Sequence, residues 1–382
     1  MSGALWVDKY RPKTLDKMDY HKKLCNRLAA MAGHGDFPHM LFYGPSGSGK
    51  KTRIMALLRE VYGPGVSKLK VESREFTNPA STSSAKAEIT LISSPYHIEV
   101  NPSDAGNKDT IVLQALLSEM AQTRSLVGAG GMLASSEAAP AGPSSTASTA
   151  VPMETGEPAA SSAPSFRVVV IAEAHRLSRQ AQNALRRTME TSAKTCRLIL
   201  TATSTTGLID ALKSRTIPIK IAAPSVDDAT AILRHVAAKE GLPLDDALAE
   251  RIVIECKRNL RRSLLLLEAN SVAQNALPKP DYEILIHNMA TSILASQTPA
   301  QLKAVRANLY DLLVHQIPPD VIMRTLVAEL EDKLDTEIRH AVVFDSAIYN
   351  HRLVLGSKPI FHLEAFVASF MFRYKQYLMS IS

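Results

Sequence analysis

One short segment constrains the fold of this chain more than any other feature. The apolar run Met40–Tyr43 leads directly into Gly44-Pro45-Ser46-Gly47-Ser48-Gly49-Lys50, and a helix-compatible stretch continues through Tyr62. This order of strand, glycine-rich loop and helix is what a phosphate-binding loop requires. The glycines let backbone amides converge on phosphate groups, and the N-terminus of the helix adds a favourable dipole. The segment therefore predicts a nucleotide site in which Lys50 reaches the β- and γ-phosphates.

The metal ligands expected beside such a loop are missing at two positions. Lys51 stands where the motif has the Ser or Thr whose hydroxyl holds magnesium, and Thr52 comes one residue too late. The apolar run Val168–Ile171 is followed by Ala172, where a metal-orienting aspartate is typical, and then by Glu173, which could polarise an attacking water. Magnesium demands near-octahedral oxygen coordination, and phosphoryl transfer relies on it. We therefore expect ATP or ADP to bind, magnesium to bind weakly if at all, and hydrolysis to be slow.

The succession of β-rich and helical segments predicts an α/β fold with a largely parallel sheet. Strand-like runs occur at 40–43, 98–100, 168–171, 198–200 and 217–221, with helical patterns between them. Two further runs, Leu69–Phe76 and Glu88–Ile92, could add a hairpin to that sheet. After Pro224 the pattern is helical to the end of the chain.

Changes in composition predict three parts: a nucleotide-binding core over 1–223, a small helical lid over 224–279 and a helical C-terminal domain over 280–382. Helical patterns at 227–240, 244–257 and 260–274 would form the lid. Within the core, 128–165 consists mainly of Ala, Ser, Gly, Pro and Thr and has no aromatic residue. Such a segment cannot bury enough apolar surface to fold, so we expect a disordered insertion that forms a passive surface loop.

Net charge, cysteine spacing and hydropathy indicate the kind of partner and the compartment to expect. The formal net charge of +7 favours polyanionic partners, and the three cysteines are too far apart to indicate a zinc site or a disulfide framework. No run of about eighteen apolar residues occurs, so no membrane span is expected. These features indicate a soluble protein of a reducing, intracellular compartment.

A single arginine lies between a helical stretch and a β-run, in Ser214-Arg215-Thr216. A lone arginine on such a loop is most often a solvated side chain or part of a surface ion pair. In a ring-shaped or spiral ATPase, however, an arginine here can reach a neighbour's γ-phosphate and stabilise the transition state.

Basic residues also crowd the stretch after Glu173. On a helix beginning near Ser178, Arg179 and Arg186 share one face, with Arg187 beside them, while Ala181, Leu185 and Met189 share the buried face. Two interpretations are equally open. The arginines could form an ordinary polar surface, or they could contact the DNA phosphate backbone without reading bases, some of them serving a subunit interface instead.

Together these segments resemble the small subunits of eukaryotic replication factor C, the AAA+ loader of the sliding clamp. The resemblance is carried by four motifs: Leu5-Trp6-Val7-Asp8-Lys9-Tyr10-Arg11-Pro12, Leu185-Arg186-Arg187-Thr188-Met189-Glu190, Ser214-Arg215-Thr216 and Asn259-Leu260-Arg261-Arg262. Segments 101–107 and 356–366 are the most specific, and they resemble the branch of the family whose ATPase is degenerate. Thr203 stands where the family usually has its sensor-1 Asn, a third departure that disfavours hydrolysis.

The resemblance implies an AAA+ core with a helical lid and an all-helical collar that joins five subunits. It implies four other replication factor C subunits, the sliding clamp (PCNA) and primer–template DNA as partners, and a nuclear location. It also implies catalytic roles for Glu173, in a degenerate site, and for Arg215, acting on a neighbour. The nucleotide contacts that it implies, together with the loop, are Val7, Tyr10, Arg11, Pro12, Gly44, Pro45, Ser46, Gly47, Ser48, Gly49, Lys50, Lys51, Thr52 and Arg261.

Three alternatives remain compatible with the sequence. The chain could be an autonomous ATPase or kinase, which Lys51 and Ala172 disfavour. It could be a scaffold that binds no nucleotide, which the intact Lys50 disfavours. It could also serve a related loader for checkpoint or cohesion complexes, with a different large partner and the same task for this chain.

Overall fold

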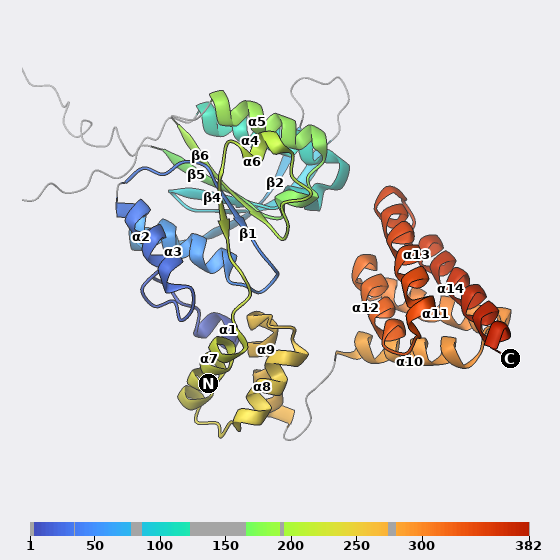
Figure 1. Cartoon of the computed structure of the whole chain (residues 1–382). Coiled ribbons are helices and arrows are strands. Elements are labelled where there is room, and N and C mark those ends of the chain that lie inside the picture. The colour runs from blue at the N-terminus through green and yellow to red at the C-terminus, as the bar shows by residue number, and fades with distance from the viewer. Residues whose placement is uncertain are drawn as a thin grey trace, which may run out of the picture. The chain divides into compact units, whose positions relative to one another are not determined.

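The computed structural model describes residues 4–33, 35–77, 86–122, 166–191, 195–273 and 280–381. The chain splits into two compact units, Met1–Asn275 and Ala276–Ser382 (Figure 1). The insertion expected at 128–165 lies outside the described residues. The division of the first unit into a core (1–223) and a lid (224–279) stays a prediction, as does the start of the C-terminal domain at 280.

A single mixed sheet forms the centre of the first unit. In spatial order its strands are β2 (Lys70–Thr77), β3 (Lys86–Ser93), β4 (His97–Val100), β5 (Arg167–Ile171), β6 (Cys196–Ala202), β1 (Met40–Tyr43) and β7 (Ile217–Lys220). The last five run parallel, whereas β2 and β3 form an antiparallel hairpin that joins them through β4. The parallel sheet and its added hairpin are therefore confirmed.

Helices cover both faces of this sheet (Figure 1). One layer contains α2 (Lys22–Gly33) and α3 (Lys50–Tyr62), and the other contains α4 (Asp109–Gln122), α5 (Arg179–Thr191) and α6 (Asp210–Lys213). Alternate strand residues enter opposite hydrophobic cores: Phe42 packs with the α2–α3 layer, and Leu41 with the α4–α5 layer. Because the central strands are covered on both sides, they read as continuous apolar runs in the sequence. The described residues of this part also contain the 3-10 turns η1 (Pro64–Ser67), η2 (Pro102–Lys108) and η4 (Ala174–Arg176).

Three helices follow the last strand: α7 (Val226–Glu240), α8 (Asp246–Glu255) and α9 (Leu260–Ala273). Ser225 caps α7 by accepting a hydrogen bond from the Asp228 amide, and Gly241 ends the helix in the left-handed conformation. The N-terminal helix α1 (Trp6–Lys9) packs against this group. The Trp6 amide donates to Glu268 Oε2 at 3.1 Å, and the Tyr10 hydroxyl donates to Glu240 Oε1 at 2.6 Å. The N-terminal motif is thus fastened to α7 and α9.

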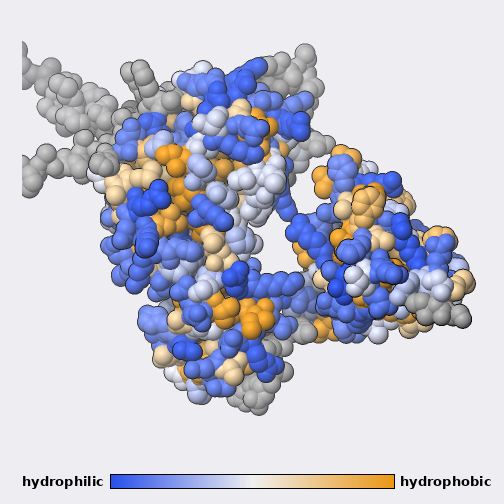
Figure 2. All heavy atoms as spheres, in the orientation of Figure 1, coloured by the Kyte–Doolittle hydropathy of each residue, from blue (hydrophilic) through white to orange (hydrophobic). Residues whose placement is uncertain are grey.

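The second unit is all-helical in its described residues. It consists of α10 (Asp281–Ala295), α11 (Pro299–Val314), α12 (Pro319–Glu331), α13 (Thr336–Leu355) and α14 (Pro359–Ile381) around one core. Helices α13 and α14 also leave large apolar side chains exposed, among them Phe344, Val354, Phe361 and Phe372. In Figure 2, orange surface lies among blue surface on this unit. Within the residues described, no helix has the length and hydropathy needed to cross a bilayer.

The buried His39 predicts a pH dependence of stability. Its Nδ1 accepts the Leu198 amide proton at 3.0 Å, and burial lowers the pKa of its imidazole. The unfolded chain therefore binds the proton more readily, and the free energy of unfolding should fall as the pH drops below about 6.5. His39→Asn keeps an acceptor without titrating, so it should show a smaller loss of stability in urea unfolding between about pH 7.5 and 5.5. The exposed His351→Gln is the control and should behave as wild type; an unchanged pH profile for His39→Asn would contradict the prediction.

Candidate nucleotide-binding site

A pocket of ≈ 830 Å³ opens in the first unit where the glycine-rich loop, the N-terminal motif and helices α7 and α9 meet. The predicted site residues that line it are Val7, Tyr10, Arg11, Pro12, Ser46, Gly47, Ser48, Gly49, Lys50, Lys51, Thr52, Glu173 and Arg261. Gly44 and Pro45 do not line it, although their carbonyls accept hydrogen bonds from Lys50, which does. The pocket is also not lined by Arg179, Arg186, Arg187 or Arg215. Segments that are far apart in sequence therefore converge on one cavity, and the role of each residue there stays a prediction.

The loop has a conformation that only glycine allows. Gly47 and Gly49 have φ values of +73° and +74°. A Cβ atom on Gly47 would lie 1.7 Å from Asn259 Oδ1, and one on Gly44 would lie 1.9 Å from the Ile221 carbonyl oxygen. Asn259 also caps α9 by accepting from the Arg262 amide at 3.2 Å. The residue that caps α9 therefore lies directly against the loop.

The ammonium of Lys50 lies inside the loop, where Nζ donates to the carbonyls of Gly44 at 2.7 Å and Pro45 at 2.8 Å. Burial and the nearby Arg261 lower the pKa of Lys50, and Glu173 opposes this shift. Lys50, Arg261 and Glu173 are therefore close enough to interact electrostatically, although they come from three separate segments.

Arg53, which no sequence motif pointed to, supports the glycine-rich loop through its Ser48 carbonyl. Its side chain is fully buried, with the guanidinium 4.3 Å from the centre of the Tyr20 ring. Nη1 donates to the Ser48 carbonyl at 3.0 Å and Nη2 to the Tyr20 carbonyl at 3.1 Å. No carboxylate among the described residues pairs with it. An arginine three positions after Lys50, within a helix face otherwise carrying Ile54 and Leu57, was the available signal.

The groups around the expected metal position do not fit magnesium. Lys51 Nζ forms an ion pair with Glu99 Oε1 at 2.6 Å. Thr52 Oγ1 accepts from Arg11 Nε at 3.3 Å, and Ala172 offers no ligand at all. Within the described ranges, no cluster of His, Cys, Asp or Glu side chains could hold a metal ion. An ammonium donates three hydrogen bonds and accepts none, so Lys51 cannot replace an oxygen ligand.

Glu173 and the neighbouring His175 both contact other side chains. Glu173 adopts a left-handed backbone conformation with φ +48°, and its carboxylate pairs with Arg176 at 3.2 Å. His175 Nε2 lies 2.9 Å from Thr203 Oγ1, and burial lowers the pKa of His175. The Glu173 carboxylate is therefore already engaged by a neighbouring guanidinium at the edge of the pocket.

Arg215 is held on the surface outside the pocket. Its Nη2 and Nε lie 2.6 Å and 2.9 Å from Glu190 Oε1, and its Nη1 donates to the Ala211 carbonyl at 3.0 Å. Glu190 belongs to the motif on α5, so two motifs that the sequence analysis named separately are joined here. In this position Arg215 is not part of its own chain's pocket.

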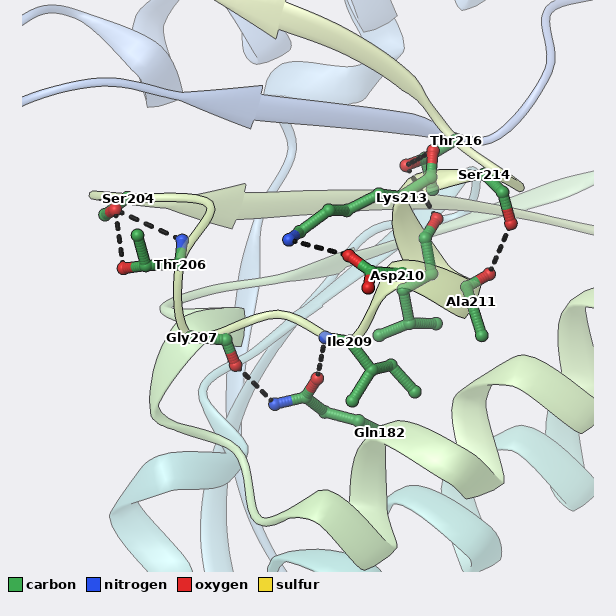
Figure 3. A network of polar contacts seen from close by, with 11 residues as sticks. Gln182, Ser204, Thr206, Gly207, Ile209, Asp210, Ala211, Lys213, Ser214 and Thr216 are labelled. Atoms are coloured by element: carbon green, nitrogen blue, oxygen red, sulfur yellow. Dashed lines mark hydrogen bonds and ion pairs between the residues drawn. The ribbon is translucent and has the colours of Figure 1, made fainter.

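Gln182 on α5 fixes the segment that leads to Arg215 (Figure 3). It is 1% exposed, donates through Nε2 to the Gly207 carbonyl at 2.9 Å, and accepts through Oε1 from the Ile209 amide at 2.9 Å. A second donation reaches the Leu177 carbonyl at 3.0 Å. No sequence motif pointed to this glutamine, although a polar residue next to Ala181 on the buried face was a usable signal.

The other arginines of this region differ in their surroundings. Arg179 and Arg187 are exposed, and Arg186 is half-buried with an Nε atom that makes no hydrogen bond within the described part of the chain. Arg197 is structural, because it pairs with Asp36 at 2.9 Å and donates to the Phe37 carbonyl at 2.7 Å. Arg179 and Arg187 are therefore available to a partner, whereas Arg197 is not.

The parallel sheet, the glycine-rich loop at the end of β1 and the helices beside the pocket define an AAA+ ATPase fold, a fold that binds nucleotide. Family models match three segments: "RCF1/5-like, AAA+ ATPase lid domain" at 231–272, "Replication factor C subunit 3, C-terminal domain" at 282–378 and "DNA polymerase III, delta subunit" at 156–225. The chain belongs to the replication factor C small-subunit family, in the branch whose members are called subunit 3 or subunit 5.

Relatives establish this assignment over the whole length. The chain is 44% identical over 381 residues to mouse replication factor C subunit 3, covering 98% of this chain and 97% of the mouse protein. It is 44% identical over 385 residues to replication factor C subunit 5 of Neurospora crassa, covering 99% of each chain. Among solved structures, the Thermotoga maritima RuvB Holliday junction branch migration motor matches 78% of this chain and 85% of its own, with 17% identity and a TM-score of 0.42. The family and fold predicted from the motifs are confirmed by the sequence relatives.

Proposed function

We propose that this chain is the clamp-loader subunit that binds ATP or ADP, hydrolyses it poorly and supplies Arg215 to a neighbouring subunit's site. The observation that carries this proposal is the charge balance of the pocket. Nine cationic side chains line it against three carboxylates, while the ligands for magnesium are missing. Such a pocket suits a polyphosphate, but it lacks the metal that phosphoryl transfer needs.

Each part of the pocket has a role in this proposal. Val7, Tyr10 and Pro12 border the adenine, the loop amides and Lys50 hold the phosphates, and Arg261 covers them. Glu173 stays paired with Arg176 at the edge of the pocket. Bound nucleotide orders the loop, the N-terminal motif and the lid as one body, which supports assembly of the loader.

The loader acts on macromolecular partners in the nucleus. With four other replication factor C subunits, the chain places the sliding clamp on primer–template DNA, using ATP hydrolysed at other subunits. The apolar side chains exposed on α13 and α14 support contacts between collar domains, which would cover them. The exposed Arg179 and Arg187 suit the DNA phosphate backbone or the subunit interface beside it.

Nucleotide binding by the isolated chain tests the proposal directly. Lys50→Ala should weaken the binding of a fluorescent ADP analogue about 10- to 100-fold, since it removes charge-assisted hydrogen bonds to phosphate. Phosphate release from ATP by the wild-type chain should stay at background. Lys220→Ala, an exposed lysine on β7 outside the pocket, is the matched control. Rapid magnesium-dependent turnover by the chain alone, or Lys50→Ala binding as wild type, would contradict the proposal.

A further inference from the structure

The ion pair between Lys51 and Glu99 lies within the nucleotide pocket. Lys51 is the second residue of α3, directly after the lysine that binds phosphate, and 42% of its side chain is exposed. Glu99 lies on β4 and its side chain is 14% exposed. Both side chains line the nucleotide pocket, so the pair faces the ligand rather than the core.

The position of this pair is where a magnesium ion would be expected. The residue after Lys50 is the one whose hydroxyl would hold the metal, and β4 pairs with β5, at whose end Ala172 replaces the orienting aspartate. Glu99 supplies a carboxylate from the neighbouring strand, but the Lys51 ammonium already binds it at 2.6 Å. A divalent cation here would have to displace an ammonium and would be repelled by it.

We propose that the Lys51 ammonium is a resident counter-ion of the nucleotide site and that the chain binds adenine nucleotide without a divalent metal. The inference rests on the proposed nucleotide binding and adds how the phosphate charge is neutralised. When phosphate enters, Lys51 donates hydrogen bonds to its oxygens, and Glu99 keeps the ammonium in place when the nucleotide leaves. The ligand class is a metal-free nucleoside di- or triphosphate.

Calorimetric titration of the nucleotide-free full chain with ADP, in excess Mg²⁺ and in excess EDTA, tests this. The wild-type dissociation constants should agree within about twofold, which is about 0.4 kcal/mol. Lys51→Thr combined with Ala172→Asp restores both oxygen ligands, so Mg²⁺ should then tighten ADP binding at least about tenfold. Tenfold tighter binding of wild type in Mg²⁺ would overturn the inference. Absence of ADP binding in both buffers would instead refute the proposed nucleotide site.

A second variant keeps the test decisive if the double substitution fails to fold. Glu99→Gln removes the carboxylate charge that competes with phosphate for Lys51, so ADP binding in EDTA should become tighter. Weaker binding by Glu99→Gln would show that the ammonium does not serve the phosphates, and would overturn the inference. Lys220→Thr, on the exposed side of β7, should match wild type in both buffers.

Discussion

Replacing Arg215 with alanine should lower ATP turnover at the neighbouring subunit's site by about 10³-fold, the lower end of the range for arginine fingers. Two observations on Arg215 support this expectation. Arg215 lies outside its own chain's pocket, and its guanidinium is already fixed by Glu190 and by the Ala211 carbonyl. The measurement is steady-state ATP hydrolysis by the reconstituted five-subunit assembly with clamp and primer–template DNA.

The turnover of the Arg215→Ala assembly should be compared with that of the same assembly carrying Lys50→Ala. If the chain's own site is structural, Lys50→Ala should reduce turnover far less than Arg215→Ala does. Arg251→Ala, an exposed arginine on α8, controls for loss of a surface charge and should hydrolyse ATP as wild type. A larger loss for Lys50→Ala than for Arg215→Ala would mean that the site is catalytically active despite Lys51 and Ala172.

Replacing Arg53 with methionine should lower the free energy of unfolding by about 3 to 5 kcal/mol. The substitution leaves the Tyr20 carbonyl without its side-chain donor and removes one of the two donors of the Ser48 carbonyl, which keeps the Tyr20 hydroxyl at 2.8 Å. It also removes the cation from the face of the Tyr20 ring. Because Ser48 belongs to the glycine-rich loop, the same variant should also bind ADP more weakly. Urea unfolding monitored by circular dichroism gives the stability, and titration gives the affinity.

The matched control for Arg53 lies on the same helix. Arg59 is only half-buried, so Arg59→Met should change the unfolding free energy by less than about 0.5 kcal/mol. An Arg53→Met variant as stable as Arg59→Met would refute the structural role of Arg53. The result would then assign its charge to ligand binding alone.

The sequence predicted the parts of the site whose chemistry follows from local spacing. The strand, loop and helix around Lys50 could be predicted because glycine positions and apolar runs are local signals. The defects at Lys51 and Ala172 could be predicted because a motif fixes which residue types belong there. The N-terminal and lid motifs were recognisable as a resemblance, and the structure brings Tyr10 and Arg261 to the same pocket.

Other features of the site depend on contacts that no local pattern encodes. Glu99 is an acidic residue within a strand, and only the pairing of β4 beside β5 brings it to Lys51. The role of Gln182 could not be predicted from local sequence, because its hydrogen-bond partners, Gly207 and Ile209, lie 25 and 27 residues away along the chain. The left-handed backbone of Glu173 and its pairing with Arg176 are results of folding that a strand pattern ending in an acid does not reveal.

The attachment of the N-terminal motif to the lid has a kinetic consequence. The Trp6 amide donates to Glu268 on α9 and the Tyr10 hydroxyl donates to Glu240 on α7, so the N-terminal motif is tied to both helices. We therefore expect the motif and these helices to move together. A nucleotide enclosed by the N-terminal motif and by helices α7 and α9 could leave only when these parts open together. Its residence time would then be set by the rate of this opening rather than by the affinity for phosphate. In an assembly whose neighbours restrain the lid, the chain would carry the same nucleotide molecule through many cycles of its partners.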